Sequence, residues 1–352
     1  MSLAPSFFLP PPQAKRNLRS LLTAVFSIFG ACALLLIQCA CGKADAPSAL
    51  SASATSPSVS ATSASASNTK SIALVMKTMS NPFFVEMEKG AQQAAKELGL
   101  TLLVRAAASE TSIEQQIQLI DDLVTQKVGA IIIAPGDSQR LVPVLKRTQM
   151  AGIFIVNIDN RLNPEAMAQA RMGPVPFVGV DNEQASYQAV KYIAEQIKQP
   201  SKAAILEGLR TAENANLRLR GARRAFAENT AIQVVASESA NWKIDEAYAL
   251  TAKFFKQHPD IRLLFCANDM MALGALKFLQ DHDKQHVLIA SYDALSDVKS
   301  AIKAGKIAVS VDQQAAQQGF HGVQLAYRML QGENVVQQLK VEARLVRAAD
   351  LP

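Results

Sequence analysis

The sequence contains few cysteines, and their positions limit what they can do. Of four cysteines in 352 residues, Cys32, Cys39 and Cys41 lie near the N-terminus and only Cys266 lies in the rest of the chain. A single thiol cannot form an internal disulfide, so the body of the protein must fold without covalent cross-links. Cys266 stands in the apolar run LLFCAND with no histidine close in sequence, which is typical of a buried thiol rather than a nucleophile.

The sequence also lacks the motifs of common catalytic and phosphate-binding sites. It has no GxxxxGK[ST] or GxGxxG loop and no GxSxG turn, and its four histidines show no metal-ligand spacing. The net charge of +6 is small, and the basic residues are dispersed among 30 acidic ones rather than gathered in a stripe. We therefore expect a binding protein rather than an enzyme, with no cofactor, no metal and no nucleic-acid partner.

The N-terminus has the pattern of an export signal followed by a linker. In residues 1–41 a basic patch precedes a long apolar stretch, as in a signal peptide. Cys39 and Cys41 are the candidates for lipidation, although Gln38 interrupts the lipobox of either one. Lipidation is favoured over an uncleaved anchor or ordinary cleavage, and all three place the body outside the cytoplasm. Residues 42–70 are rich in Ala and Ser and predict a disordered tether.

From residue 71 onward, short apolar runs alternate with helical patterns. Runs such as VGAIIIAP and RLLFCAND are apolar throughout, which indicates strands covered on both faces by helices. Roughly ten such units are too many for one compact open sheet, so we predict an α/β protein with two doubly wound parallel-sheet lobes. Ser112 and Gln115 predict a capping box at the start of one helix.

Polar and aromatic residues recur at the carboxyl ends of the predicted strands, where open parallel sheets bind their ligands. Carboxylate, carboxamide and guanidinium groups can engage two neighbouring hydroxyls, and aromatic rings stack on the C–H faces of a sugar. Each residue alone could equally cap a helix or fill the core, and Asp181 and Asp269 are interpreted mainly as caps. Their recurrence predicts a site for a polyhydroxyl ligand.

Residues 71–346 resemble the type I periplasmic binding proteins for sugars, in particular the ribose-binding group. The strings IALVMKTMSNPFF, FCANDMMALGAL and KIAVSVDQ match in order and spacing. The resemblance implies two lobes joined by a three-stranded hinge that closes over the ligand. The crossings are expected near residues 180–182, 312–314 and 341–343. The N-terminal lobe is expected to comprise residues 71–180 with 314–341, and the C-terminal lobe residues 182–312 with 343–352.

Carried over residue by residue, the resemblance implies a ring of ligand-binding side chains from both lobes. They are Asn81, Phe83, Phe84, Asp159, Asn160, Asn214, Arg218, Trp242, Asn268, Tyr292, Asp293 and Gln313. The sequence departs from the ribose binders at four positions. Ala134 and Asn160 stand where they have Asn and Arg, and Trp242 and Tyr292 where they have Phe. We therefore expect another pentose, a hexose, a polyol or a cyclitol as readily as ribose.

These features together predict an extracytoplasmic solute-binding protein of an ABC importer. It would bind its ligand by hinge closure and deliver it to a permease in the inner membrane. We expect a lipid-anchored monomer in the periplasm or on the outer face of the cell membrane, with a chemoreceptor as a further partner. The alternative is a receptor for a sugar-like signal that partners a sensor kinase or a chemoreceptor.

Overall fold

The computed structural model describes residues 71–352. The predicted leader, the tether and the lipidation candidates Cys39 and Cys41 lie outside the described residues. Within the described part, no helix combines the length and the apolar character that a membrane crossing requires.

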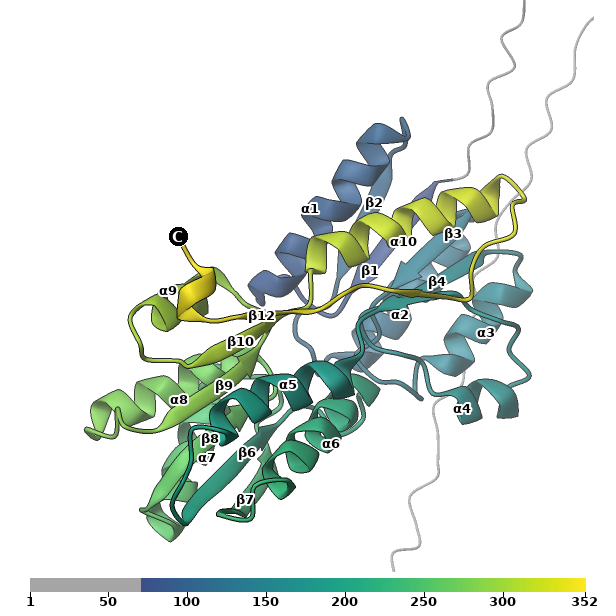
Figure 1. Ribbon diagram of the computed structural model, residues 1–352. Coiled ribbons are helices and arrows are strands. Elements are labelled where there is room, and N and C mark those ends of the chain that lie inside the picture. The colour runs from purple at the N-terminus through teal and green to yellow at the C-terminus, as the bar shows by residue number, and fades with distance from the viewer. Residues whose placement is uncertain (1–70) are drawn as a thin grey trace, which may run out of the picture. The chain divides into compact units, whose positions relative to one another are not determined.

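The first sheet has six strands in the order β11-β5-β4-β3-β1-β2, and all of its neighbouring pairs are parallel. Figure 1 labels β1 to β4 of this sheet. The strands are β1 (Ile72–Met76), β2 (Leu102–Ala106), β3 (Ala130–Ile133), β4 (Phe154–Ile158), β5 (Phe177–Gly179) and β11 (Gln338–Lys340). Its helices are α1 (Pro82–Glu97), α2 (Ile113–Thr125), α3 (Val142–Met150), α4 (Pro164–Gln169) and α10 (Ala315–Leu330). We call this sheet with its helices the first lobe.

The central strands β1 and β3 of the first lobe are apolar, as expected where helices cover both faces of the sheet. Along β1, Ile72, Leu74 and Met76 pack in one core with α1 and α10, whereas Ala73 and Val75 pack in a second core with α2 and α3. Successive side chains of a strand point to opposite faces, so nearly every position of a strand between two helix layers is buried and favours an apolar residue.

The second lobe has a sheet in the order β12-β10-β9-β8-β6-β7. Its strands are β6 (Ser201–Glu207), β7 (Ile232–Ser239), β8 (Ile261–Cys266), β9 (Leu288–Tyr292), β10 (Val309–Asp312) and β12 (Arg344–Val346). Its helices are α5 (Asn182–Ala194), α6 (Glu213–Ala227), α7 (Ile244–Gln257), α8 (Asp269–Asp281) and α9 (Ser296–Lys303), and a 3₁₀ turn (Ala348–Asp350) follows β12. The pairs α5–α6 and α7–α8 pack closely.

The chain passes between the two lobes three times. It crosses from β5 to α5, from β10 to α10, and from β11 to β12 (Figure 1). The strand order changes direction at β1 in the first sheet and at β6 in the second. In each case the two connections leave the sheet on opposite sides and open a crevice at the carboxyl ends of the strands.

One strand pairing is an exception within the predicted fold class, and one predicted helix cap is absent. The sheet of the second lobe is not wholly parallel, because β12 is reached directly from β11 and pairs antiparallel with β10. Ser112 and Gln115 do not form a capping box, since the preceding loop turns back on them. The hydroxyl of Ser112 contacts Ser109 Oγ (2.8 Å), and Gln115 Oε1 accepts the N–H of Ala108 (2.7 Å).

Candidate functional site

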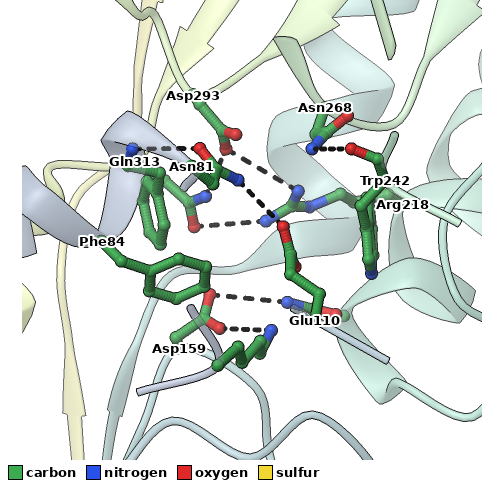
Figure 2. Close-up of a pocket in the computed structure, with 12 residues that line it drawn as sticks. Asn81, Phe84, Glu110, Asp159, Arg218, Trp242, Asn268, Asp293 and Gln313 are labelled. Atoms are coloured by element: carbon green, nitrogen blue, oxygen red, sulfur yellow. Dashed lines mark hydrogen bonds and ion pairs between the residues drawn. The ribbon is translucent and has the colours of Figure 1, made fainter. Parts of the chain in front are cut away.

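A cavity lies at the carboxyl ends of both sheets and is lined by both lobes (Figure 2). The lining residues are Lys77, Asn81, Phe83, Phe84, Glu110, Asp159, Asn214, Arg218, Trp242, Asn268, Asp293 and Gln313. Of the predicted ligand-binding residues, all except Asn160 and Tyr292 are in this set. Lys77 and Glu110 were not predicted.

Asn81 and Asn268 each cap a helix and also line the cavity, so they combine the two roles that the sequence left open for them. Asn81 Oδ1 accepts the N–H of Phe83 (3.0 Å) at the start of α1, and Asn268 Oδ1 accepts the N–H of Met271 (2.9 Å) at the start of α8. Each oxygen therefore caps a helix. The amide nitrogen of each residue stays in the cavity wall, where Asn81 Nδ2 donates to Glu110 Oε1 (3.0 Å). Capping thus fixes the direction in which each donor points.

Arg218 is the most firmly held charge in the cavity wall. Its side chain is buried and donates from Nε to Asn182 Oδ1 (2.8 Å), from Nη1 to Ala267 O (2.8 Å) and from Nη2 to Gln313 Oε1 (3.2 Å). The guanidinium lies over the ring of Tyr292, with Cζ 3.7 Å from the ring centroid. Tyr292 therefore supports Arg218 from behind. It is buried beneath the guanidinium rather than placed in the cavity wall, and burial raises the pKa of its hydroxyl.

Asp293 lies beside Arg218 in a strained turn. Its φ is 123° and that of Ala294 is 53°, both in the region that favours glycine. Gln313 Nε2 donates to Asp293 Oδ1 (2.6 Å), and Arg218 Nη1 lies 3.9 Å from the same oxygen. Burial raises the pKa of Asp293 well above its ordinary value, and the positive charge of Arg218 opposes this shift.

A buried ion pair forms the opposite wall of the cavity. Lys77 Nζ lies 2.8 Å from Asp159 Oδ2, and both side chains are almost fully buried. The carboxylate of Glu110 lies in the same wall, and desolvation raises its pKa while Lys77 opposes the shift. Lys77 follows β1 and Glu110 lies in the loop after β2. Both residues therefore lie beyond strand ends, where open parallel sheets bind their ligands, and this position is their signal in the sequence.

The aromatic walls are Phe84 and Trp242 (Figure 2). Trp242 is held by an unusual backbone, since Asn241 and Trp242 have φ values of 50° and 67°. Its indole lies directly against Gly208, where a Cβ would overlap the ring. Within the described residues, Trp242 Nε1 and Asn214 Oδ1 have no hydrogen-bond partner although both are buried. Buried polar atoms normally have partners, so these two are available to a ligand.

Asn160 is turned away from the cavity, contrary to the expected contact with the ligand. The residue is fully buried, and Nδ2 donates to Pro135 O (2.9 Å) and Ser138 Oγ (3.1 Å). Its Oδ1 accepts the N–H of Asn214 (3.1 Å). All polar atoms of its side chain are therefore engaged within the protein.

The cavity offers binding groups but no catalytic arrangement. In residues 71–352, no group of three or more His, Cys, Asp and Glu side chains is placed to hold a metal ion. The thiol of Cys266 is fully buried, and burial raises its pKa, so it is not an activated nucleophile. Fold and cavity together define a two-lobed α/β protein whose polar cavity suits a small ligand.

The chain belongs to the periplasmic binding protein family, because residues 72–334 match the periplasmic binding protein domain. It is 36% identical over 265 residues to the D-ribose/D-allose-binding protein of Pseudomonas aeruginosa, which covers 74% of this chain and 82% of that protein. It is 31% identical to the D-allose-binding periplasmic protein of Escherichia coli K12, covering 72% of this chain and 82% of that protein.

The fold also matches solved structures. An ABC transporter periplasmic solute-binding protein from Actinobacillus succinogenes with bound D-allose superimposes with a TM-score of 0.76 at 34% identity. The match covers 80% of this chain and 98% of that one. These comparisons confirm the predicted family and fold class, and they confirm a binding protein rather than an enzyme.

Proposed function

We propose that this protein captures a monosaccharide in the cavity between its lobes and delivers it to an ABC transporter. The observation that carries the proposal is the composition of the cavity wall. Charged and amide groups from both lobes line the cavity together with the rings of Phe84 and Trp242. Such a wall suits a ring whose edge is lined with hydroxyls and whose faces are apolar.

The comparisons favour transport over the alternative of a signal receptor. The relatives named above are sugar-binding proteins, and the related structure is a solute-binding protein of an ABC transporter. Membership of the family implies a periplasmic location. We propose in addition a monomer that is tethered through Cys39 or Cys41, with an inner-membrane permease and a chemoreceptor as partners.

Within the sugars, we propose an aldohexose of the allose configuration as the preferred ligand. D-Allose carries the ring hydroxyls of D-ribose together with an additional hydroxymethyl group. Lys77 and Glu110 add a cation and a carboxyl to the cavity wall, which suits one more hydroxyl. Two of the relatives are D-allose-binding proteins, and the related structure contains bound D-allose, which supports the same ligand.

The proposed mechanism is closure of the lobes about the three crossings. The ligand would contact Lys77, Asn81 and Asp159 in the first lobe and Arg218, Trp242 and Asp293 in the second. Because the contacts with one lobe alone are incomplete, ligand binding would shift the population toward the closed form.

A thermal-shift screen of the purified protein tests the proposal. The panel should contain D-allose, D-ribose, other aldopentoses and aldohexoses, polyols and cyclitols. A ligand at about 100 times its Kd should add about 2.7 kcal/mol to the free energy of unfolding. We expect D-allose to give the largest shift and D-ribose a smaller one. A panel in which no sugar raises the melting temperature would refute sugar binding, and a cyclitol with the largest shift would refute the assignment of the ligand class.

A further inference from the structure

Helix α6 begins without a cap of its own. Its N-cap residue is Ala212, which has no side-chain oxygen, and no side chain of the segment caps the first turn. The first amides of a helix point away from the helix and need acceptors from elsewhere. The same helix carries Asn214 and Arg218 of the cavity wall, so its first turn is buried at the boundary between the lobes.

The missing acceptors come from the other lobe. The N–H of Glu213 donates to Ser138 Oγ (3.0 Å), and the N–H of Asn214 donates to Asn160 Oδ1 (3.1 Å). In the reverse direction, the N–H of Ser138 donates to Thr211 O (3.0 Å). Ser138 follows β3 and Asn160 follows β4, both in the first sheet, whereas α6 packs in the second lobe.

Contacts within the first lobe hold the acceptors in place. Asn160 Nδ2 donates to Pro135 O, which leaves Oδ1 as the atom that faces α6. The neighbouring main chain is fixed by Asn157, whose Nδ2 donates to Asn160 O (2.8 Å) and whose Oδ1 accepts the N–H of Leu162 (2.9 Å). All of these partners belong to the first lobe, so the geometry does not depend on α6.

We infer that Ser138 and Asn160 cap α6 across the boundary between the lobes and so favour closure independently of the ligand. The inference rests on the proposed function, since it concerns the closure that encloses the sugar. When the lobes separate, the amides of Glu213 and Asn214 lose these acceptors and turn to water. The two residues are therefore positioning residues: they set how easily Arg218 and Asn214 reach the closed position, without touching the sugar.

This role has a signature that a ligand contact does not share. A residue that contacts the sugar discriminates between sugars. When it is removed, the loss of affinity depends on whether a given sugar carries the hydroxyl that the residue binds. A residue that only favours closure changes the affinity for every sugar by the same factor. The effect should lie in the dissociation rate, because opening breaks the cap whereas encounter with the open form does not.

The test uses the variants Ser138→Ala and Asn160→Ala with Asn163→Ala as a matched control. Asn163 Oδ1 accepts the N–H of Ala166 (2.8 Å) and caps α4 within the first lobe, so its variant also removes a helix cap but none between the lobes. The protein has a single tryptophan, and this Trp242 lies in the cavity wall, so stopped-flow fluorescence can report sugar release without a label. Ser138→Thr, which keeps the hydroxyl, tests rescue.

We expect Ser138→Ala and Asn160→Ala each to raise the Kd and the dissociation rate about fivefold for every sugar that binds, as is typical for loss of a helix cap. Ser138→Thr and Asn163→Ala should behave as the unaltered protein. Factors that differ between sugars would show that Asn160 contacts the ligand, and unchanged dissociation rates would show that the cap does not favour closure. Either result overturns the inference, and Ser138→Ala decides the matter if Asn160→Ala does not fold.

A second measurement needs no sugar. Hydrogen exchange of the peptide spanning residues 209–216 should be about fivefold faster in Ser138→Ala than in the unaltered ligand-free protein or in Asn163→Ala. Equal exchange in all three proteins would contradict a ligand-independent cap. If no sugar binds the unaltered protein, sugar binding fails as a function, and the exchange result still decides whether the cap exists.

Discussion

Substituting Gly208 by alanine should alter the cavity by displacing the indole of Trp242, because the new methyl group would overlap the ring. Gly208 follows β6, and a Cβ at this position would overlap Cη2 and Cζ2 of the indole. To regain an ordinary carbon–carbon distance the ring must move by roughly 1.5 Å. Trp242 is only 4% exposed, so the ring has no room to move outward and must turn toward the cavity it lines.

The expected magnitude has two parts. Overpacking of this kind lowers the free energy of unfolding by about 1–3 kcal/mol. A ring displaced into the cavity also occupies part of the space that the ligand needs, so we expect sugar affinity to fall at least tenfold. A tenfold loss corresponds to about 1.4 kcal/mol of binding free energy.

The assay is isothermal titration together with urea unfolding of Gly208→Ala, Trp242→Ala and the double variant. Trp242→Ala alone should weaken binding by removing an aromatic wall. In the double variant the clash is absent, so Gly208→Ala should cost almost no further stability or affinity, and the two changes should be strongly non-additive. If the effects simply add, or if Gly208→Ala binds sugar normally, the reasoning about the indole is wrong.

Two further predictions concern buried charges. Lys77→Met leaves the Asp159 carboxylate buried without its cation, which should lower the free energy of unfolding by about 3 kcal/mol, as measured by urea unfolding. Adding Asp159→Asn to the same chain should recover most of this stability, because no unpaired charge remains buried. It should not recover sugar binding. The carboxyl of Asp269 is fully buried, and burial raises its pKa to about 7. The folded protein therefore binds this proton more tightly than the unfolded chain, so the contribution of Asp269 to stability falls as the pH rises from about 4 to 7. Urea unfolding across this range should show a flatter profile for Asp269→Asn, and parallel profiles would exclude Asp269 as the source.

Much of the fold could be predicted because strands buried on both faces have a simple sequence signature. All residues of β1 and β3 are buried, and both are apolar from end to end. The strands β11 and β12 could not be predicted in the same way. Each has three residues, of which most are exposed or partly exposed, and each lies at the edge of its sheet. Their pairing depends on where the chain arrives after crossing between the lobes, which no local pattern records.

The candidate site was predictable as a location but not as a set of contacts. The end of β4 places Asp159 and Asn160 together at the carboxyl edge of the sheet, and no local pattern distinguishes the roles of these two neighbours. In the structure Asp159 lines the cavity and Asn160 does not, because the Pro135 carbonyl orients the Asn160 amide. That carbonyl comes from the loop after another strand, so only the assembled sheet determines which way the side chain turns.

The double duty of Asn81 and Asn268 limits how this pocket can be redesigned. Replacing either one to alter sugar preference would also loosen the start of a helix, so a change in selectivity would be confounded with a loss of stability. Cavity-lining positions that cap no helix are better starting points. A sensor for a new sugar should therefore be designed by varying other residues of the cavity wall, with Asn81 and Asn268 kept unchanged.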